Sequence, residues 1–154
     1  MTTKRPGWAL AAWVTLGFAA AAATTGTAVA AEARTLVVLP FDMVDTSLQG
    51  EMNHGPLADD VARLKRTEAV VQRALAARDE FDILPREPIA GQIEQAQQSY
   101  RYLYACNGCE VDIGKAAGAD LVMTGWVQKV SNLIININAT LYDVASGDTV
   151  GGAS

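Results

Sequence analysis

The sequence has very few of the side chains from which metal and haem sites are built: one histidine, His54, and two cysteines, Cys106 and Cys109, among 154 residues. A structural zinc site or an iron–sulfur cluster needs about four ligands. A metal site here would therefore have to combine both cysteines with His54 and a carboxylate. Covalent haem attachment requires C-x-x-C-H, and Glu110 follows Cys109, which excludes it.

Catalytic and nucleotide-binding motifs are also missing. The hydrolase motif G-x-S-x-G does not occur, and a Ser-His-Asp triad would have to use His54. The segment "GKAAGAD" (114–120) lacks the G-x-x-x-x-G-K-[ST] pattern of a phosphate-binding loop. Nothing in the sequence demands an enzyme or implies a cofactor.

The first 31 residues have the pattern of a secretory signal peptide. A basic start with Lys4 and Arg5 precedes an uncharged, alanine-rich run that ends with Ala28 and Ala30 in an A-x-A pattern. We predict cleavage after Ala30 or Ala31. The alternative is an uncleaved membrane anchor, but alanine is only weakly hydrophobic for a bilayer span.

Residues 32–154 are expected to form a single domain with a modest core. Without Lys4 and Arg5, ten basic residues remain against 17 acidic ones, a net charge near −7. This balance argues against nucleic acid as a partner and against anionic lipid, so no stable membrane span is expected after cleavage. Export indicates a periplasmic location, where neighbouring cysteines tend to pair.

Hydrophobic periodicity predicts an α/β (α+β) fold in the order β-α-β-α-α-β-β-β. Two parallel crossovers lead into an antiparallel meander, which gives a mixed sheet in two or three layers. The predicted elements are a strand at 34–41, a helix at 56–80, a strand at 81–85, helical pieces at 87–104, a helix at 109–119, and strands at 120–130, 133–144 and from 149 onward.

The strand at 133–144 alternates strictly between apolar and polar residues, which indicates one buried and one wet face. The apolar set is Leu133, Ile135, Ile137, Ala139 and Leu141. The strand that follows residue 148 is expected at the edge of the sheet, where it can pair with another chain.

The polar segment 42–55 is predicted to be a loop at the carboxyl end of the first strand, where open α/β sheets bind ligands. Its candidate binding residues are Asp42, Asp45, Thr46, Ser47, Glu51, Asn53 and His54. Oxygen-rich loops suit hard cations. The spacing matches no calcium loop, however, so a solvated polar loop is the simpler interpretation.

The C-x-x-C pair is open to two further interpretations. A structural disulfide between Cys106 and Cys109 would close a short loop, with a stabilisation at the low end of about 2–4 kcal/mol. Alternatively, the start of a helix near Cys109 would lower the pKa of its thiol, as in thiol–disulfide oxidoreductases. Glu110 in the first turn opposes that effect.

Several segments resemble known families. "LVVLPFDMVDTSLQGE" and "CNGCEVDIGKAAGADLVMTGWVQKVSNLIININATLYDVASGDTV" resemble an uncharacterised family of exported proteobacterial proteins labelled as a domain of unknown function, whose members occur beside genes for quinoprotein methanol oxidation. More loosely, "VLPF", "GADLVMTGWVQKV" and "INATLYDVASGDTV" are similar to the amino-terminal domain of TolB and the periplasmic domain of the curli secretion lipoprotein. No β-propeller follows as in TolB, and no lipidated cysteine precedes as in the curli protein.

These resemblances imply an α/β domain that acts through protein contacts. The sequence therefore predicts a non-catalytic periplasmic accessory or binding module whose partner is another cell-envelope protein of a periplasmic oxidation system. Two alternatives stay open. One is a thiol–disulfide oxidoreductase with Cys106 as nucleophile and Cys109 as resolving thiol. The other is a metal-binding carrier that uses Asp42, Asp45, Glu51 and His54.

Overall fold

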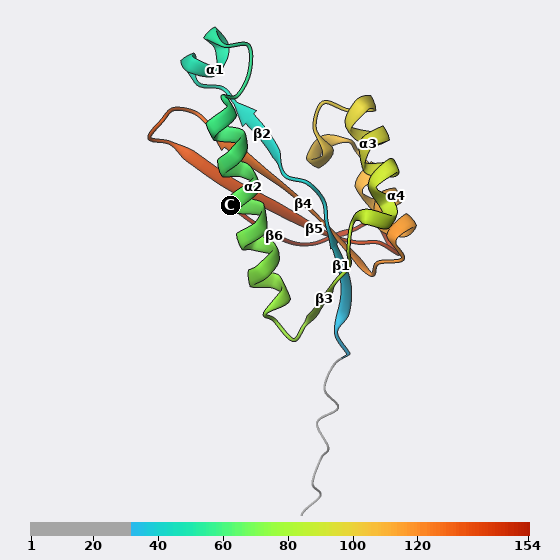
Figure 1. Ribbon diagram of the computed structural model, residues 1–154. Coiled ribbons are helices and arrows are strands. Elements are labelled where there is room, and N and C mark those ends of the chain that lie inside the picture. Colours follow the sequence, from blue (N-terminus) through green and yellow to red (C-terminus); the bar gives the residue numbers. More distant parts are fainter. Residues whose placement is uncertain (1–31) are drawn as a thin grey trace, which may run out of the picture. The chain divides into compact units, whose positions relative to one another are not determined.

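The computed structural model describes residues 32–154 (Figure 1), so the predicted signal peptide and its cleavage site lie outside the described residues. Within them, no helix has the length and apolar character needed to cross a membrane. The strands are β1 (Arg34–Val38), β2 (Asp42–Asp45), β3 (Phe81–Ile83), β4 (Leu121–Lys129), β5 (Ile135–Asp143) and β6 (Thr149–Ala153). The helices are α1 (Leu48–Met52), α2 (Ala58–Ala76), α3 (Ala90–Ser99) and α4 (Cys109–Ala117), with short 3-10 turns η1 (Glu87–Ile89) and η2 (Leu103–Ala105).

A mixed sheet in the order β3-β1-β4-β5-β6 organises the domain, and β2 also pairs with β4. β1 lies parallel to both β3 and β4, whereas β4, β5 and β6 form an antiparallel meander. The predicted α/β class, the two parallel crossovers and the meander are therefore confirmed. The central strand β4 has parallel neighbours on one side and an antiparallel neighbour on the other.

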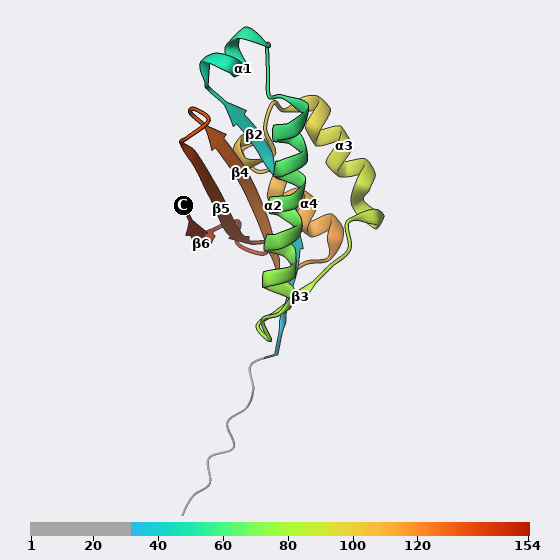
Figure 2. The same cartoon turned by 60° about the vertical axis from the view of Figure 1, so that its left-hand side comes forward.

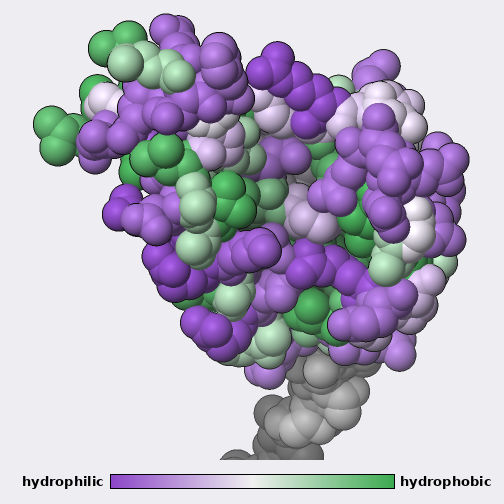
Figure 3. Space-filling model, turned by 45° about the horizontal axis from the view of Figure 1, so that its top comes forward, coloured by the Kyte–Doolittle hydropathy of each residue, from purple (hydrophilic) through white to green (hydrophobic). Residues whose placement is uncertain are grey.

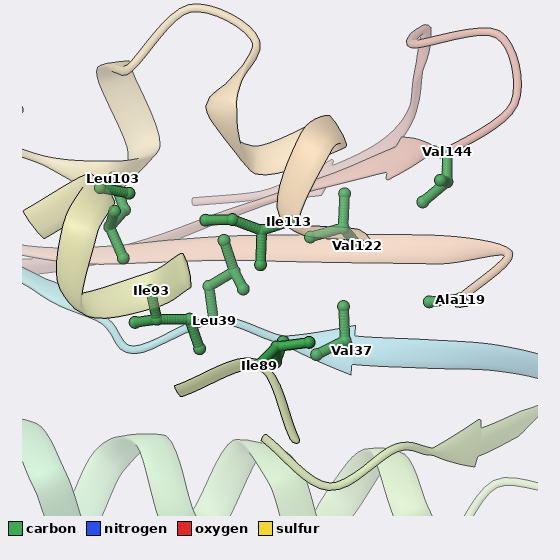
Figure 4. Close-up of a cluster of buried hydrophobic side chains, with 10 residues drawn as sticks. Val37, Leu39, Ile89, Ile93, Leu103, Ile113, Ala119, Val122 and Val144 are labelled. Carbon is green, nitrogen blue, oxygen red and sulfur yellow. The ribbon is translucent and has the colours of Figure 1, made fainter. Parts of the chain in front are cut away.

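Helices cover both faces of the sheet, with α2 on one face and α3 and α4 on the other (Figures 1 and 2). The alternation of β1 explains the two cores, because Leu36 and Val38 point toward α2 while Val37 points toward α3 and α4. Figure 4 shows the core on the α3 and α4 side of the sheet, in which Val37 lies among apolar side chains that include Ile89 and Ile113. The apolar residues of β1 are thus buried on both faces of the sheet.

The expected loop at 42–55 is wrong, because the segment forms β2 and α1. After Pro40 the chain rejoins β4 with one extra residue, so that Val38 pairs with Met123 but Asp42 pairs with Trp126. The next helix is held by its cap, since the Ser47 hydroxyl accepts a hydrogen bond from the backbone N–H of Gly50 (3.1 Å). Both elements are very short, so their periodicity is too weak to detect in the sequence.

Candidate binding groove

A groove of about 560 Å³ opens between α2 and the β4–β5 hairpin. Its walls are largely apolar, and its ends carry charged side chains. The lining residues are Met43, Asp60, Arg63, Leu64, Arg66, Thr67, Val70, Val71, Val127, Lys129, Ile135 and Ile137. A groove of this size lies within the range of roughly 300–1,000 Å³ that is typical of ligand sites.

The groove exists because α2 covers only part of its face of the sheet. Leu64 is buried against β1 and β4, whereas Val70, farther along the same helix, is 55% exposed. Beyond the helix, Ile135 and Ile137 of β5 are 46% and 48% exposed. The expectation that the apolar side of this strand is buried is therefore wrong for its first half. Figure 3 shows exposed hydrophobic residues among hydrophilic ones at the end of the molecule that carries α1.

One end of the groove is closed by a buried ion cluster around Lys129. Its ammonium group lies 2.6 Å from Oδ2 of Asp60 and donates a second hydrogen bond to Oε1 of Gln49 (3.2 Å). Oδ2 of Asp45 lies 3.8 Å away, and the Asp45 side chain is 1% exposed. Burial by itself would raise the pKa of Asp45. Hydrogen bonds from Ser47 and the charge of Lys129 outweigh that effect, so the pKa is lowered.

Positive charge lines the rim on the α2 side. Arg63 and Arg66 are both exposed, and the guanidinium of Arg63 is only loosely tied to Asp60 at 3.9 Å. Lys129 is neutralised by its buried carboxylates, so the arginines dominate the accessible charge of the groove. Apolar walls with a basic rim favour an apolar occupant that carries negative charge.

The residues predicted from segment 42–55 do not form one site. Asp42 accepts a hydrogen bond from the backbone N–H of Tyr104 (3.0 Å), and its pKa is raised by burial. Ser47 caps α1, and the hydroxyl of Thr46 donates to the carbonyl oxygen of Lys129 (3.3 Å). Asp45 belongs to the buried ion cluster. These side chains hold β2 and α1 on the domain, which is a structural task.

The side chains predicted to bind a metal in a carrier do not lie together in the described residues. The remaining candidates Glu51, Asn53 and His54 are exposed around the end of α1. Within residues 32–154, the metal-ligand side chains close enough to share an ion are Cys106, Cys109 and Glu110. The four residues Asp42, Asp45, Glu51 and His54 are not such a group, so this prediction is not supported.

Cys106 and Cys109 are joined by a disulfide, with 5.6 Å between their Cα atoms. α4 begins at Cys109, as predicted, but Cys106 is only 3% exposed while Cys109 is half-buried. The expected role of Cys106 as attacking nucleophile is therefore unsupported, because Cys109 is the more accessible sulfur. The buried carboxylate of Glu110 lies 2.8 Å from Sγ of Cys106 and accepts a hydrogen bond from the backbone N–H of Gly108 (3.0 Å).

The aromatic residues near the disulfide pack on one another. The Tyr104 ring stacks on Trp126 at 4.4 Å between centroids and on Tyr102 at 5.5 Å. Trp126 thus has a packing role.

Sequence reasoning missed the groove itself. Its main side chains are Arg63, Arg66, Val70, Lys129, Ile135 and Ile137. The available signal was Lys129, a charged residue on the same side of β4 as the apolar residues Met123 and Val127. A lysine at such a position requires a buried carboxylate partner.

A protein-family model described as "DUF3280: Protein of unknown function (DUF2380)" matches residues 34–154. No curated protein matches the chain. Solved structures do. The LpoB C-terminal domain from Escherichia coli is 15% identical with a TM-score of 0.55, covering 78% of this chain and 78% of that one. The same domain from Salmonella enterica is 15% identical with a TM-score of 0.53, covering 79% and 80%.

TolB, which the sequence also resembles, is represented by the structure from Acinetobacter baumannii. It is 15% identical with a TM-score of 0.42, covering 79% of this chain and 22% of that one. That score is too low to support an argument. The two LpoB domains show a shared α/β fold, and at 15% identity they show the fold alone.

Proposed function

The chain belongs to the DUF3280 family of proteins of unknown function, and we propose that it is a non-catalytic periplasmic module that binds another cell-envelope protein. The observation that carries this proposal is the exposed apolar groove beside α2. Apolar side chains that remain exposed around a formed groove mark a surface that another molecule covers.

The chemistry of the described residues supports binding over catalysis. Lys129, Asp60 and Asp45 form a buried cluster of one cation and two carboxylates, with Arg63 3.9 Å from Asp60, and these ion pairs stabilise the fold. The ring of His54, the one histidine of the sequence, is exposed at the end of α1. Asp60 and Lys129 line one end of the groove as an ion pair, and His54 does not line it.

The periplasmic location and the envelope partner are inferred from the sequence. The amino-terminal 31 residues have the pattern of a signal peptide, and the chain resembles exported proteins that lie beside genes for periplasmic oxidation. The disulfide between Cys106 and Cys109 is consistent with an oxidising compartment. We propose a partner from such an oxidation system.

Site-specific photo-crosslinking in the organism of origin tests this function. A photo-reactive phenylalanine in place of Val70, at the groove, is expected to yield a discrete adduct with one envelope protein. The same residue in place of the exposed Gln98 on α3, on the other side of the sheet, serves as the control. Absence of any adduct at Val70, or identical adducts at both positions, would count against the proposal.

A thiol–disulfide exchange activity is a second candidate, favoured by the partial exposure of Cys109 at the start of α4, whereas the carboxylate of Glu110 beside Cys106 opposes release of that thiolate. An external dithiol would attack Cys109, which forms a mixed disulfide and releases Cys106 as a thiolate. Attack by the second thiol of the reductant then releases Cys109 and completes the two-electron reduction. Turnover in a dithiol-dependent insulin reduction assay, lost in Cys109→Ser, would establish this activity.

A further inference from the structure

The uncovered face of the sheet extends beyond the groove along β5 and β6. Leu141 of β5 and Val150 of β6 line a second hollow of about 460 Å³ together with Phe81 and Leu121, and the charged residues Glu32, Arg34, Asp79 and Glu80 complete its lining. Leu141 lies on the same side of β5 as Ile135 and Ile137, because the three are separated by even numbers of residues. An apolar strip thus runs along the sheet beside α2, and we call it the β5–β6 face.

The width of this face matches one helix. β5 is flanked by β4 along its whole length and by β6 only from Ala139 to Tyr142. Neighbouring strands lie about 4.8 Å apart, so β5 and one neighbour present a surface about 10 Å wide. An α-helix with its side chains has a diameter of about 10–12 Å. α2 covers its own share of the same face, and a second helix laid beside it would complete the layer.

The length of the face sets the length of that helix. From Ile135 to Leu141 the strand advances about 20 Å, at about 3.4 Å per residue. A helix of about 14 residues spans the same distance, at about 1.5 Å per residue. Apolar side chains at i, i+4, i+7 and i+11 of such a helix would follow the strip.

The charge of the α2 rim selects among such helices. Arg63 and Arg66 lie along the groove, on a chain with 17 acidic and 12 basic residues. Lys65 is also exposed but does not line the groove. Successive residues of a helix are rotated by about 100°, so Lys65 lies on a different side of α2 from Arg63 and Arg66. A helix in the groove therefore meets the arginines with its edge, and carboxylates on that edge complement them.

From these observations we infer that the β5–β6 face binds an amphipathic helix of a partner protein, with carboxylates along the edge that faces Arg63 and Arg66. This inference rests on the proposed binding function and adds to it the surface and the chemistry of the partner.

Synthetic peptides provide the test, with the chain isolated from the periplasm. One 14-residue helical peptide carries leucine at the four anchor positions and glutamate along one edge, and a second has lysine in place of each glutamate. Calorimetric titration is expected to show binding of the glutamate peptide and at least about tenfold weaker binding of the lysine peptide.

Variants of the chain connect the binding to the face. Arg66→Glu is expected to weaken the glutamate peptide about tenfold, whereas Lys65→Glu, with the same charge change one residue away, is expected to leave it unchanged. Ile137→Thr, which keeps a β-branched side chain on the strand, should weaken both peptides. Urea unfolding of each variant confirms that the fold is intact.

Several results would overturn the inference. They are equal affinity for both peptides, equal effects of Lys65→Glu and Arg66→Glu, and no binding up to about 1 mM peptide. Concentration-dependent dimers lost in Ile137→Thr would assign the face to a second copy instead. An adduct at Val70 without peptide binding would leave the proposed function standing and remove only the helix, so the two failures are distinguishable.

Discussion

The ammonium group of Lys129 lies 2.6 Å from a carboxylate oxygen of Asp60, and the two side chains are only 3% and 8% exposed. The pair joins the last residue of β4 to the first turn of α2, two elements that are far apart in the chain. It therefore holds the first turn of α2 against the end of β4, where one end of the groove lies.

Loss of the lysine should destabilise the domain strongly. Lys129→Met leaves the carboxylates of Asp60 and Asp45 buried without their cation, which typically costs about 3–5 kcal/mol of the free energy of unfolding. Urea denaturation measures this change. The matched control is Lys115→Met, which breaks an exposed pair with Asp112 and should cost less than about 1 kcal/mol. Similar values for both variants would contradict a structural role of the cluster.

Gly125 of β4 is expected to tolerate no side chain. A Cβ atom there would overlap the ring of Phe41, which is itself buried in the core on the α2 side. Gly125→Ala should lower the free energy of unfolding by about 1–3 kcal/mol, since the core must shift to accept the methyl group. Gly91→Ala in α3 meets open space and serves as the control, with a neutral or slightly stabilising effect. Equal stability of the two variants would refute the close approach.

Acid should weaken the domain partly through Asp120. Hydrogen bonds from the hydroxyl and the backbone N–H of Thr35 hold the pKa of Asp120 below its ordinary value of 3.8. Because the folded-state pKa is the lower one, this contribution is fully present above the unfolded-state pKa and is lost as pH falls through the folded-state pKa. Asp42, whose pKa is raised by burial, contributes with the opposite sign.

Thr35→Val isolates the Asp120 contribution. Urea unfolding between about pH 5 and pH 2 should show a smaller loss of stability on acidification in Thr35→Val than in the parent chain. Ser99→Ala, which removes a hydroxyl that donates to the carbonyl oxygen of Gln95, is the control and should keep the parent slope. A parent-like slope in Thr35→Val would show that the depressed pKa has another source.

The intact mass of protein isolated from the periplasm tests processing and the state of the cysteines together. We expect the loss of the first 30 or 31 residues and, after alkylation without reductant, no alkyl group, because Cys106 and Cys109 are joined. Reduction before alkylation should add two groups and provides the control. Two groups without reductant would mean that the pair is held as thiols, and thiol–disulfide exchange would become the leading candidate.

The class of the fold and the order of its longer elements could be predicted because periodicity in the sequence is strong there. The continuous apolar run in 34–41 and the alternation of 133–144 each predicted a strand. β2 and α1 were missed because four and five residues carry too little periodicity, and their pairing depends on β4, which follows about 80 residues later.

The candidate site was less predictable because it depends on which surfaces meet. Alternation assigns Ile135 and Ile137 to one side of β5 but cannot show that α2 ends its coverage before reaching them. Likewise, Asp45 looks like a loop ligand in the sequence, and only the approach of Lys129 gives it a structural role.

The position of β4 in the sheet has a consequence for how the domain forms during synthesis. β1 and β2 precede β4 by about 80 residues and both pair with it, so before residue 121 emerges the strands of the described residues can form just the short parallel pair of β1 and β3. A two-stranded sheet of that size is marginal in water. The sequence separation of these contacts also slows folding. The complete sheet therefore forms only after β4, β5 and β6, up to Ala153, have been synthesised.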